Sequence, residues 1–351
     1  MSSILRRLDS IVAPDPEMGV LAQRRLNELT KPARSLGRLE DLARDLCLMT
    51  GECPPAVGKA VIFTLAGDHG VVTEGVSAYP QVVTYQMVEN FLNGGAAVNV
   101  LARQVGARVV VADIGIAGLP LDRPGLQQRR VAPGTANLAR GPALTRDQVV
   151  AAIEVGAALV EEERARGLDL IGTGEMGIGN TTAASAVTAA ITGLSAEAVT
   201  GRGTGVDDAT WRRKVEVVTR GLAVNRPDGA DGLDVLAKVG GLEIAGLAGV
   251  VLAGAAHRIP IILDGFIAGA AALAAVTLQP EARHYLIAAH RSVEPGHGAI
   301  LTALGLTPYL DLGMRLGEGT GAALGIGLAR AAVAILAEMA TFKSAGVSGR
   351  A

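Results

Sequence analysis

Ala60-Val61-Ile62-Phe63-Thr64-Leu65-Ala66 is followed at once by Gly67-Asp68-His69-Gly70. The first part is a continuous apolar run, interrupted by one threonine and without polar alternation. Such a run is typical of a strand that is covered on both faces in a parallel sheet. Glycine and polar residues directly after a strand are typical of the edge at which α/β sheets bind ligands. This stretch therefore predicts an α/β fold with a ligand site at the carboxyl ends of its strands.

The same arrangement recurs along the chain. Further short apolar runs are predicted as strands at residues 108–112, 168–171, 259–263 and, more weakly, 285–289. Helical patterns accompany them at residues 83–104, 145–166, 181–192, 207–225 and 241–256. Strands that alternate with helices form βαβ units with right-handed crossovers. We therefore expect a parallel Rossmann-like sheet with helices on both faces.

The two chain ends lie outside this alternation and have helical patterns of their own. We predict that residues 1–55 and 320–351 form a small, mainly helical lobe. Residues 56–319 then form a large α/β domain that contains the active site, with a polar loop at residues 201–210.

Composition limits the class of protein. The chain has 351 residues, of which 46 are glycine and only 3% aromatic, so small residues must pack its core. Its net charge of −2 gives no reason to expect nucleic acid or an anionic membrane as a partner.

Cys47 and Cys53 have no Cys or His companions at ligand spacing, which indicates reduced thiols. The N-terminus lacks the features of a signal peptide, and the apolar stretches at residues 244–256 and 265–278 are short for a membrane span. We expect a cytoplasmic protein.

Polar and glycine-rich runs follow every predicted strand, at residues 66–70, 113–115, 172–182, 264–266 and 290–292. The carboxyl ends of parallel strands meet at one edge of the sheet. Several such runs at the same edge favour one shared site.

The third of these runs allows two interpretations. Gly172, Gly174 and Gly177 form a GxGxxG pattern after a strand, which would suit a dinucleotide-dependent oxidoreductase. Glu175 inside that turn would place a negative charge beside a pyrophosphate. Gly177 and Gly179 before a helix start also suit a nest for a single phosphate. In that case Glu175 faces a neutral or cationic part of the ligand.

Glu318 lies between Gly317 and Gly319, just before an alanine-rich helical pattern. Flanking glycines allow the backbone to approach a ligand closely. The carboxylate is therefore a candidate general base. The alternative is an acid that the dipole of the following helix stabilises. A non-catalytic nucleotide-binding protein would bind its ligand without needing Glu318.

Taken together, these motifs resemble the nicotinate-nucleotide–dimethylbenzimidazole phosphoribosyltransferase family over essentially the whole chain. The runs that carry the resemblance are Lys31-Pro32, residues 35–40, 67–71 with 74–76, 174–177 with 180–182, 238–241, 263–266, and 315–319 with 321–323. No shorter pattern in the chain is as specific.

The resemblance implies an enzyme of cobalamin lower-ligand assembly. It would transfer phosphoribose from nicotinate mononucleotide to 5,6-dimethylbenzimidazole or a related base, releasing nicotinate and forming an α-ribazole 5′-phosphate. Glu318 corresponds to the general base and Glu175 to a second acid near the base pocket. Because the pyridinium of the donor already makes nicotinate a good leaving group, no metal or cofactor is expected. The family also implies a homodimer.

The resemblance further assigns binding residues. Those for the phosphate and ribose are Gly177, Gly203, Lys214, Asp264, Ser292, Arg315 and Leu316. Those for the base are Tyr79, Pro80, Val83 and Met87. A family member has serine and glutamine in place of Tyr79 and Met87, which leaves the acceptor open among benzimidazoles, phenols and adenine.

Some of these residues also have simpler interpretations. Without the resemblance, Lys214 is typical of a solvated basic helix face, and Asp264 of a cap on the helix that follows it. Asp68-His69 could be a metal pair, but the other histidines are scattered, which favours a hydrogen-bonded structural pair. Arg38 and Glu40 are expected to pack the lobe or an interface.

Overall fold

The computed structural model describes residues 3–118, 120–203 and 205–348. Its centre is a six-stranded parallel sheet with the order β3-β2-β1-β4-β5-β6. The strands are β1 (Ala60–Gly67), β2 (Arg108–Gly115), β3 (Leu126–Gln128), β4 (Leu170–Met176), β5 (Ile261–Leu263) and β6 (Leu286–Ala288). Successive strands are added on one side of β1 up to β3 and on its other side from β4 onward, and ligands bind at such a reversal of strand order in open α/β sheets.

The predicted strands are confirmed, and one strand was missed. All residues of β1 are buried, as its apolar run predicts, and β1 pairs with both β2 and β4. The missed strand, β3, has the sequence Leu126-Gln127-Gln128 and lies at the edge of the sheet. It is short and has no apolar run, so the sequence gives no signal for it.

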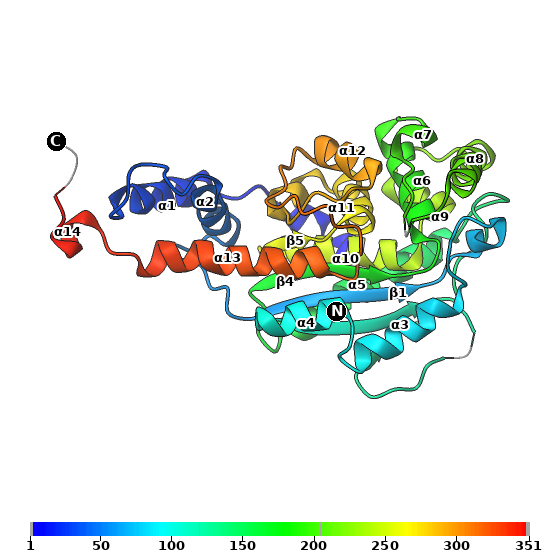
Figure 1. Cartoon of the computed structure of the whole chain (residues 1–351), viewed down its shortest axis with the longest axis horizontal. Coiled ribbons are helices and arrows are strands. Elements are labelled where there is room, and N and C mark those ends of the chain that lie inside the picture. Colours follow the sequence, from blue (N-terminus) through cyan, green and yellow to red (C-terminus); the bar gives the residue numbers. More distant parts are fainter. Residues whose placement is uncertain (1–2, 119, 204, 349–351) are drawn as a thin grey trace.

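Helices cover both faces of the sheet (Figure 1). The helices are α1 (Pro16–Glu28), α2 (Arg38–Thr50), α3 (Val82–Leu92), α4 (Ala97–Gln104), α5 (Arg146–Arg164), α6 (Asn180–Thr192), α7 (Ala196–Val199), α8 (Asp208–Asn225), α9 (Gly232–Val239), α10 (Leu242–Ala256), α11 (Phe266–Leu278), α12 (Pro295–Leu304), α13 (Thr320–Glu338) and α14 (Phe342–Ala345). Short 3-10 helices are η1 (Ile4–Arg6), η2 (Leu8–Ser10), η3 (Gly70–Glu74) and η4 (Pro280–Tyr285).

The prediction of one helix over residues 83–104 was wrong. The chain breaks there into α3 and α4, because Gly94 adopts a left-handed conformation with φ +74°. The Asn99 side chain then accepts a hydrogen bond from the Ala96 N–H at 3.1 Å and starts α4. The break matters for the site, since it turns the start of α4 toward Glu318.

Small residues bring the layers close together. On one face of the sheet, a Cβ at Gly246 of α10 would overlap the side chains of Leu65 and Ile114. Gly156 of α5 lies against the Gly246 carbonyl, so α5 and α10 are nearly in backbone contact. On the other face, the side chain of Ala322 from α13 lies over Gly172 of β4. The high glycine content thus serves close packing.

Helix α13 is the one helix in the described part of the chain that is long and apolar enough to cross a membrane. It packs against β1, β4 and β5, and 56% of its apolar window is buried. These contacts are those of a core helix. The two shorter apolar stretches of the sequence are α10 and α11, whose residues are almost all buried.

The helices of the chain ends lie together at one end of the molecule (Figure 1). Helix α2 packs on α1 and α13. Arg38 donates to the carbonyls of Thr307 and Pro308 at 2.7 and 2.6 Å and lies over the Tyr309 ring, so α2 is bonded to the segment that follows α12. Helix α13 begins on the sheet and ends beside Arg25 of α1. We propose that these end helices form the predicted lobe; its boundary at residue 320 stays a prediction.

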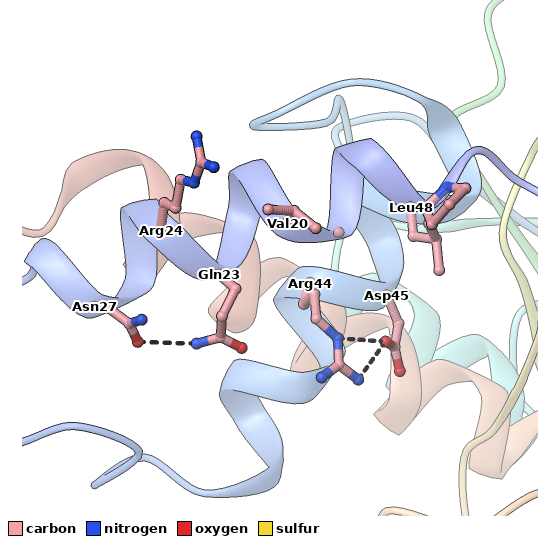
Figure 2. Close-up of a pocket in the computed structure, with 9 residues that line it drawn as sticks. Val20, Gln23, Arg24, Asn27, Arg44, Asp45 and Leu48 are labelled. Atoms are coloured by element: carbon pink, nitrogen blue, oxygen red, sulfur yellow. Dashed lines mark hydrogen bonds and ion pairs between the residues drawn. The ribbon is translucent and has the colours of Figure 1, made fainter.

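A groove of about 470 Å³ lies between α1 and α2 (Figure 2). Its polar side chains pair with one another: Gln23 donates to Asn27 at 3.0 Å, and Arg44 donates to Asp45 at 2.9 Å. The residues around it come from these two helices alone, and none follows a strand of the sheet. The groove is therefore separate from the predicted site.

Candidate functional site

A larger cavity, of about 650 Å³, opens at the carboxyl ends of the central strands. Most of the predicted site residues line it. They are Tyr79, Val83, Met87, Glu175, Gly203, Asp264, Ser292, Arg315, Leu316 and Glu318. Gly177, Pro80 and Lys214 are absent from its lining. They come from the ends of β4 and β5, from the segments after β6 and before α13, from α3 and the segment before it, and from the loop before α8. The polar runs after β4, β5 and β6 thus share the cavity, whereas the runs at residues 66–70 and 113–115, after β1 and β2, do not line it.

Glu318 has a strained backbone. Its φ is +67°, in a region that side-chain-bearing residues seldom adopt. Its carbonyl accepts a hydrogen bond from the Thr64 hydroxyl at 2.9 Å, and its carboxylate lies 3.5 Å from the Val98 N–H at the start of α4. Strain of this kind costs about 1–3 kcal/mol and is held only where surrounding contacts fix it. The conformation therefore points to a functional reason for this carboxylate.

Gly174 makes room for Glu318. A Cβ at Gly174 would overlap the Glu318 carbonyl oxygen and the Gly319 nitrogen. The dinucleotide interpretation of Gly172 and Gly174 was wrong, because both lie inside β4. Gly172 packs under α13, and Gly174 lets the Glu318 segment cross the end of the sheet.

Asp264 holds the same segment in place. Its carboxylate accepts the Gly319 N–H at 3.0 Å and the Gly321 N–H at 2.6 Å. It therefore caps α13, which is remote in sequence, and the alternative interpretation of Asp264 as a cap on the helix that follows it was wrong. Contact of Asp264 with the ribose stays a prediction. Burial acts to lower the pKa of His290, but the nearby Asp264 carboxylate raises that pKa above its ordinary value.

Glu175 is buried beside Glu318. Burial raises the pKa of Glu175 well above its ordinary value, and the charges of Asp264, Glu243 and Glu318 raise it further. The Asn180 side chain donates a hydrogen bond to its carboxyl group. Burial also raises the pKa of Glu318. A base with a raised pKa is a better proton acceptor near neutral pH.

Of the residues predicted to bind phosphate, Gly203 and Ser292 line the cavity, and Lys214 lies next to this part of it. Lys214 points inward from α8, is 1% exposed, and donates to the Thr181 hydroxyl at 2.7 Å. The interpretation of Lys214 as part of a solvated face was therefore wrong. Burial lowers the pKa of Lys214 to about 8, although the charge of Glu294 opposes this. Thr181 and Gly203 both line the cavity, so Lys214 acts on it through the residues that form its wall.

Gly177 lies beneath the cavity. A Cβ there would overlap the Gly67 carbonyl, and the ring of His69 is close by. The anion nest predicted around Gly177 thus packs against the end of β1, and Ile178 and Asn180 face the cavity in its place. Contact of Gly177 with phosphate stays a prediction, as does contact of Pro80 with the base.

Asp68 and His69 bond to other partners. His69 Nε2 lies 2.7 Å from Glu243 Oε1, with both side chains fully buried. Asp68 accepts the Ala117 N–H at 2.8 Å. They are thus not a pair with each other. No group of three or more His, Cys, Asp or Glu side chains in the described ranges could hold a metal ion.

Sequence reasoning missed two residues near the site. Glu243 pairs with His69, and Glu294 accepts the Gly203 N–H at 2.8 Å. Glu294 follows Ser292 at the end of the last strand, and this position was a usable signal.

Known proteins share this architecture. A family model described as phosphoribosyltransferase matches residues 11–347. A protein of Geobacter sulfurreducens is 56% identical over 99% of both chains, and one of Desulforudis audaxviator is 55% identical over 98% of both. Each is named nicotinate-nucleotide–dimethylbenzimidazole phosphoribosyltransferase. The crystal structure of CobT from Thermus thermophilus is 50% identical and superimposes with a TM-score of 0.92, covering 95% of this chain and 100% of that one.

Proposed function

The chain belongs to the phosphoribosyltransferase family, and we propose that it transfers the phosphoribosyl group of nicotinate mononucleotide to 5,6-dimethylbenzimidazole or a related azole. Nicotinate leaves, and an α-ribazole 5′-phosphate forms. The name shared by its relatives gives both substrates. The observation that most supports the chemistry is that Glu318, whose backbone is strained, lines the cavity at the sheet edge.

The reaction needs one proton acceptor. One azole nitrogen attacks C1 of the ribose, and the bond from C1 to the nicotinate nitrogen breaks with its electron pair remaining on nicotinate. The azole becomes cationic and must lose the proton on its other nitrogen. Glu318 accepts that proton. Since the departing ring is a pyridinium in the donor, its loss creates no negative charge on nitrogen, and the step as written requires no metal ion or redox cofactor.

Glu175 supports Glu318 because, when the two carboxyl groups share one proton, Glu175 carries it. Two acids close together in a buried site do not both ionise easily, so their pKa values move apart. Glu175 is the more buried of the two and has the more strongly raised pKa. With Glu175 neutral, Glu318 remains the anion that can act as a base.

The cavity has one apolar and one polar end. Val83 and Met87 from α3 offer an apolar wall to a flat azole. The polar end combines Gly203, Ser292 and Thr181, with Lys214 behind it. We assign the base to the first end and the phosphate to the second. We assign Arg315, Leu316 and Asp264, which also line the cavity, to the ribose.

The assembly and location belong to the same proposal. We propose a cytoplasmic homodimer with small-molecule substrates and no nucleic-acid or membrane partner. Val20 and Leu21 of α1 are exposed apolar side chains on the lobe, which supports burial against a second copy.

An acceptor panel tests the reaction. Nicotinate release from nicotinate mononucleotide is measured with benzimidazoles, phenols and adenine, each added separately. We expect 5,6-dimethylbenzimidazole and similar azoles to be the best acceptors, because Val83 and Met87 make the wall apolar. Dialysis against a chelator should leave the rate unchanged. A rate that only one divalent ion restores would refute the metal-free step, and release with none of the acceptors would refute the proposed function.

A further inference from the structure

Glu294 occupies an unusual position between two cavities. It is the N-cap residue of α12, yet its side chain does not cap that helix. Its Oε1 accepts the Gly203 N–H at 2.8 Å, and the residue is only 6% exposed. Its Oε2 is buried without a hydrogen-bond partner in the part of the chain that the structure describes. A buried carboxylate oxygen without a donor is costly, so an ordinary structural role does not account for this side chain.

The donors around Glu294 form a cradle for an anion. A Cβ on Gly203 would lie 3.1 Å from the Thr181 hydroxyl and 3.2 Å from the Lys214 ammonium. The N–H of Gly203, the Thr181 hydroxyl and the Lys214 ammonium therefore meet in one small volume. The negative charge of Glu294 acts on Lys214 there, since it opposes the lowering of the Lys214 pKa by burial. Of these donors only the Gly203 N–H bonds to Glu294, while the Lys214 ammonium donates to the Thr181 hydroxyl.

We propose that the Glu294 carboxylate occupies the phosphate subsite when no substrate is bound, and that the phosphate of the mononucleotide displaces it from the Gly203 N–H. This inference rests on the proposed function, which places the phosphate at Gly203 and Lys214. Both anions need the same N–H, and two like charges side by side in a buried site repel strongly. The incoming phosphate must therefore move Glu294 away.

The neighbouring cavity can receive the displaced carboxylate. It measures about 430 Å³, and Glu294 and Arg315 line it as well as the main cavity. Arg202 and Trp211, which lie against each other, also line it. If the Glu294 side chain rotates, its carboxylate leaves the Gly203 N–H and can pair with the guanidinium groups that line this cavity. Glu294 therefore favours ligands that carry a phosphate over other anions, because only a phosphate has enough charge to displace it. A free azole binds elsewhere in the cavity and leaves Glu294 in place.

Replacing Glu294 with glutamine tests the inference. The amide oxygen of E294Q can still accept the Gly203 N–H, but the competing charge is gone. We expect inorganic phosphate and nicotinate mononucleotide to bind about tenfold more tightly or better, because like-charge contacts disfavour binding strongly. The dissociation constant of the free azole should not change. Titration calorimetry measures all three.

The pH of the titration is chosen to keep Lys214 charged. Loss of the Glu294 charge lowers the pKa of Lys214 below its present value of about 8. Titrations near pH 6 keep the ammonium charged in both proteins. The matched control is E197Q, because Glu197 is an exposed carboxylate on the neighbouring cavity. It removes one charge nearby without touching Gly203, and its phosphate affinity should equal that of the wild type.

The outcomes separate this inference from the proposed function. An unchanged or weaker affinity of E294Q for inorganic phosphate overturns the displacement of Glu294. Weaker mononucleotide binding with unchanged phosphate binding would instead make Glu294 a ribose ligand, which also overturns it. If wild-type protein fails to bind the mononucleotide at all, the proposed function itself fails. Should E294Q unfold at a lower temperature than the assay allows, E294N replaces it: its shorter, neutral side chain removes the same charge, releases the Gly203 N–H and should likewise tighten phosphate binding.

Discussion

Replacing Glu318 with glutamine is expected to lower kcat by about 10²–10⁴-fold, the usual contribution of a general base. Glutamine keeps the size of the side chain and can stay in the same backbone conformation, but it cannot accept the azole proton. Binding of nicotinate mononucleotide should be nearly unchanged, since its leaving group and phosphate do not use this carboxylate. Steady-state kinetics and calorimetric titration measure the two effects.

The pH dependence supplies the control for this variant. A base works only when deprotonated, and burial raises the pKa of Glu318 above that of an ordinary glutamate. Wild-type kcat should therefore fall as the pH drops through this raised pKa. The residual activity of E318Q should lack that acidic limb. Near-normal turnover in E318Q, or an acidic limb that persists, would remove Glu318 from the proton transfer.

Replacing Lys214 with alanine is expected to weaken nicotinate mononucleotide by roughly 10- to 150-fold, the equivalent of about 1.5–3 kcal/mol for a charged hydrogen bond. The free azole should bind as before, because Lys214 lies behind the polar end of the cavity. The lysine loses its charge as the pH rises through its pKa of about 8. Mononucleotide affinity of the wild type should therefore decline above that pH, and that of K214A should not.

Arg212 offers the matched control for Lys214. It lies on the same helix, α8, but is exposed, whereas Lys214 is buried. R212A should bind both ligands like the wild type. If K214A weakened the azole as much as the mononucleotide, Lys214 would be a support of the fold and not a phosphate ligand.

The sequence predicts most of the fold because each main strand has a local pattern of apolar residues. Residues 60–66 are apolar without interruption except at Thr64, and glycine follows them, so both the strand and its functional end are visible. Strand β3 lacks such a pattern, since its pairing with β2 depends on backbone bonds that any residue can make. The break before α4 depends on the left-handed conformation of Gly94, which an apolar periodicity conceals.

The site is predictable only in part, for a related reason. Glu175 and Asp264 could be placed at the sheet edge because each belongs to a polar run at a strand end. Their partners could not be named. The cap that Asp264 places on α13 and the bond between Gly203 and Glu294 join segments far apart in sequence. Gly174 illustrates the same limit: its lack of a side chain is explained by the Glu318 backbone, which only the folded chain brings there.

The most direct test of the account follows nicotinate release with and without an acceptor. Wild-type protein is incubated with nicotinate mononucleotide alone, and then with 5,6-dimethylbenzimidazole added; free nicotinate and α-ribazole 5′-phosphate are quantified together. We expect negligible release without the azole and, with it, one nicotinate for each azole nucleotide formed, because the attacking azole and Glu318 act in the same step. Release that is independent of the azole, or release without formation of the azole nucleotide, would contradict it.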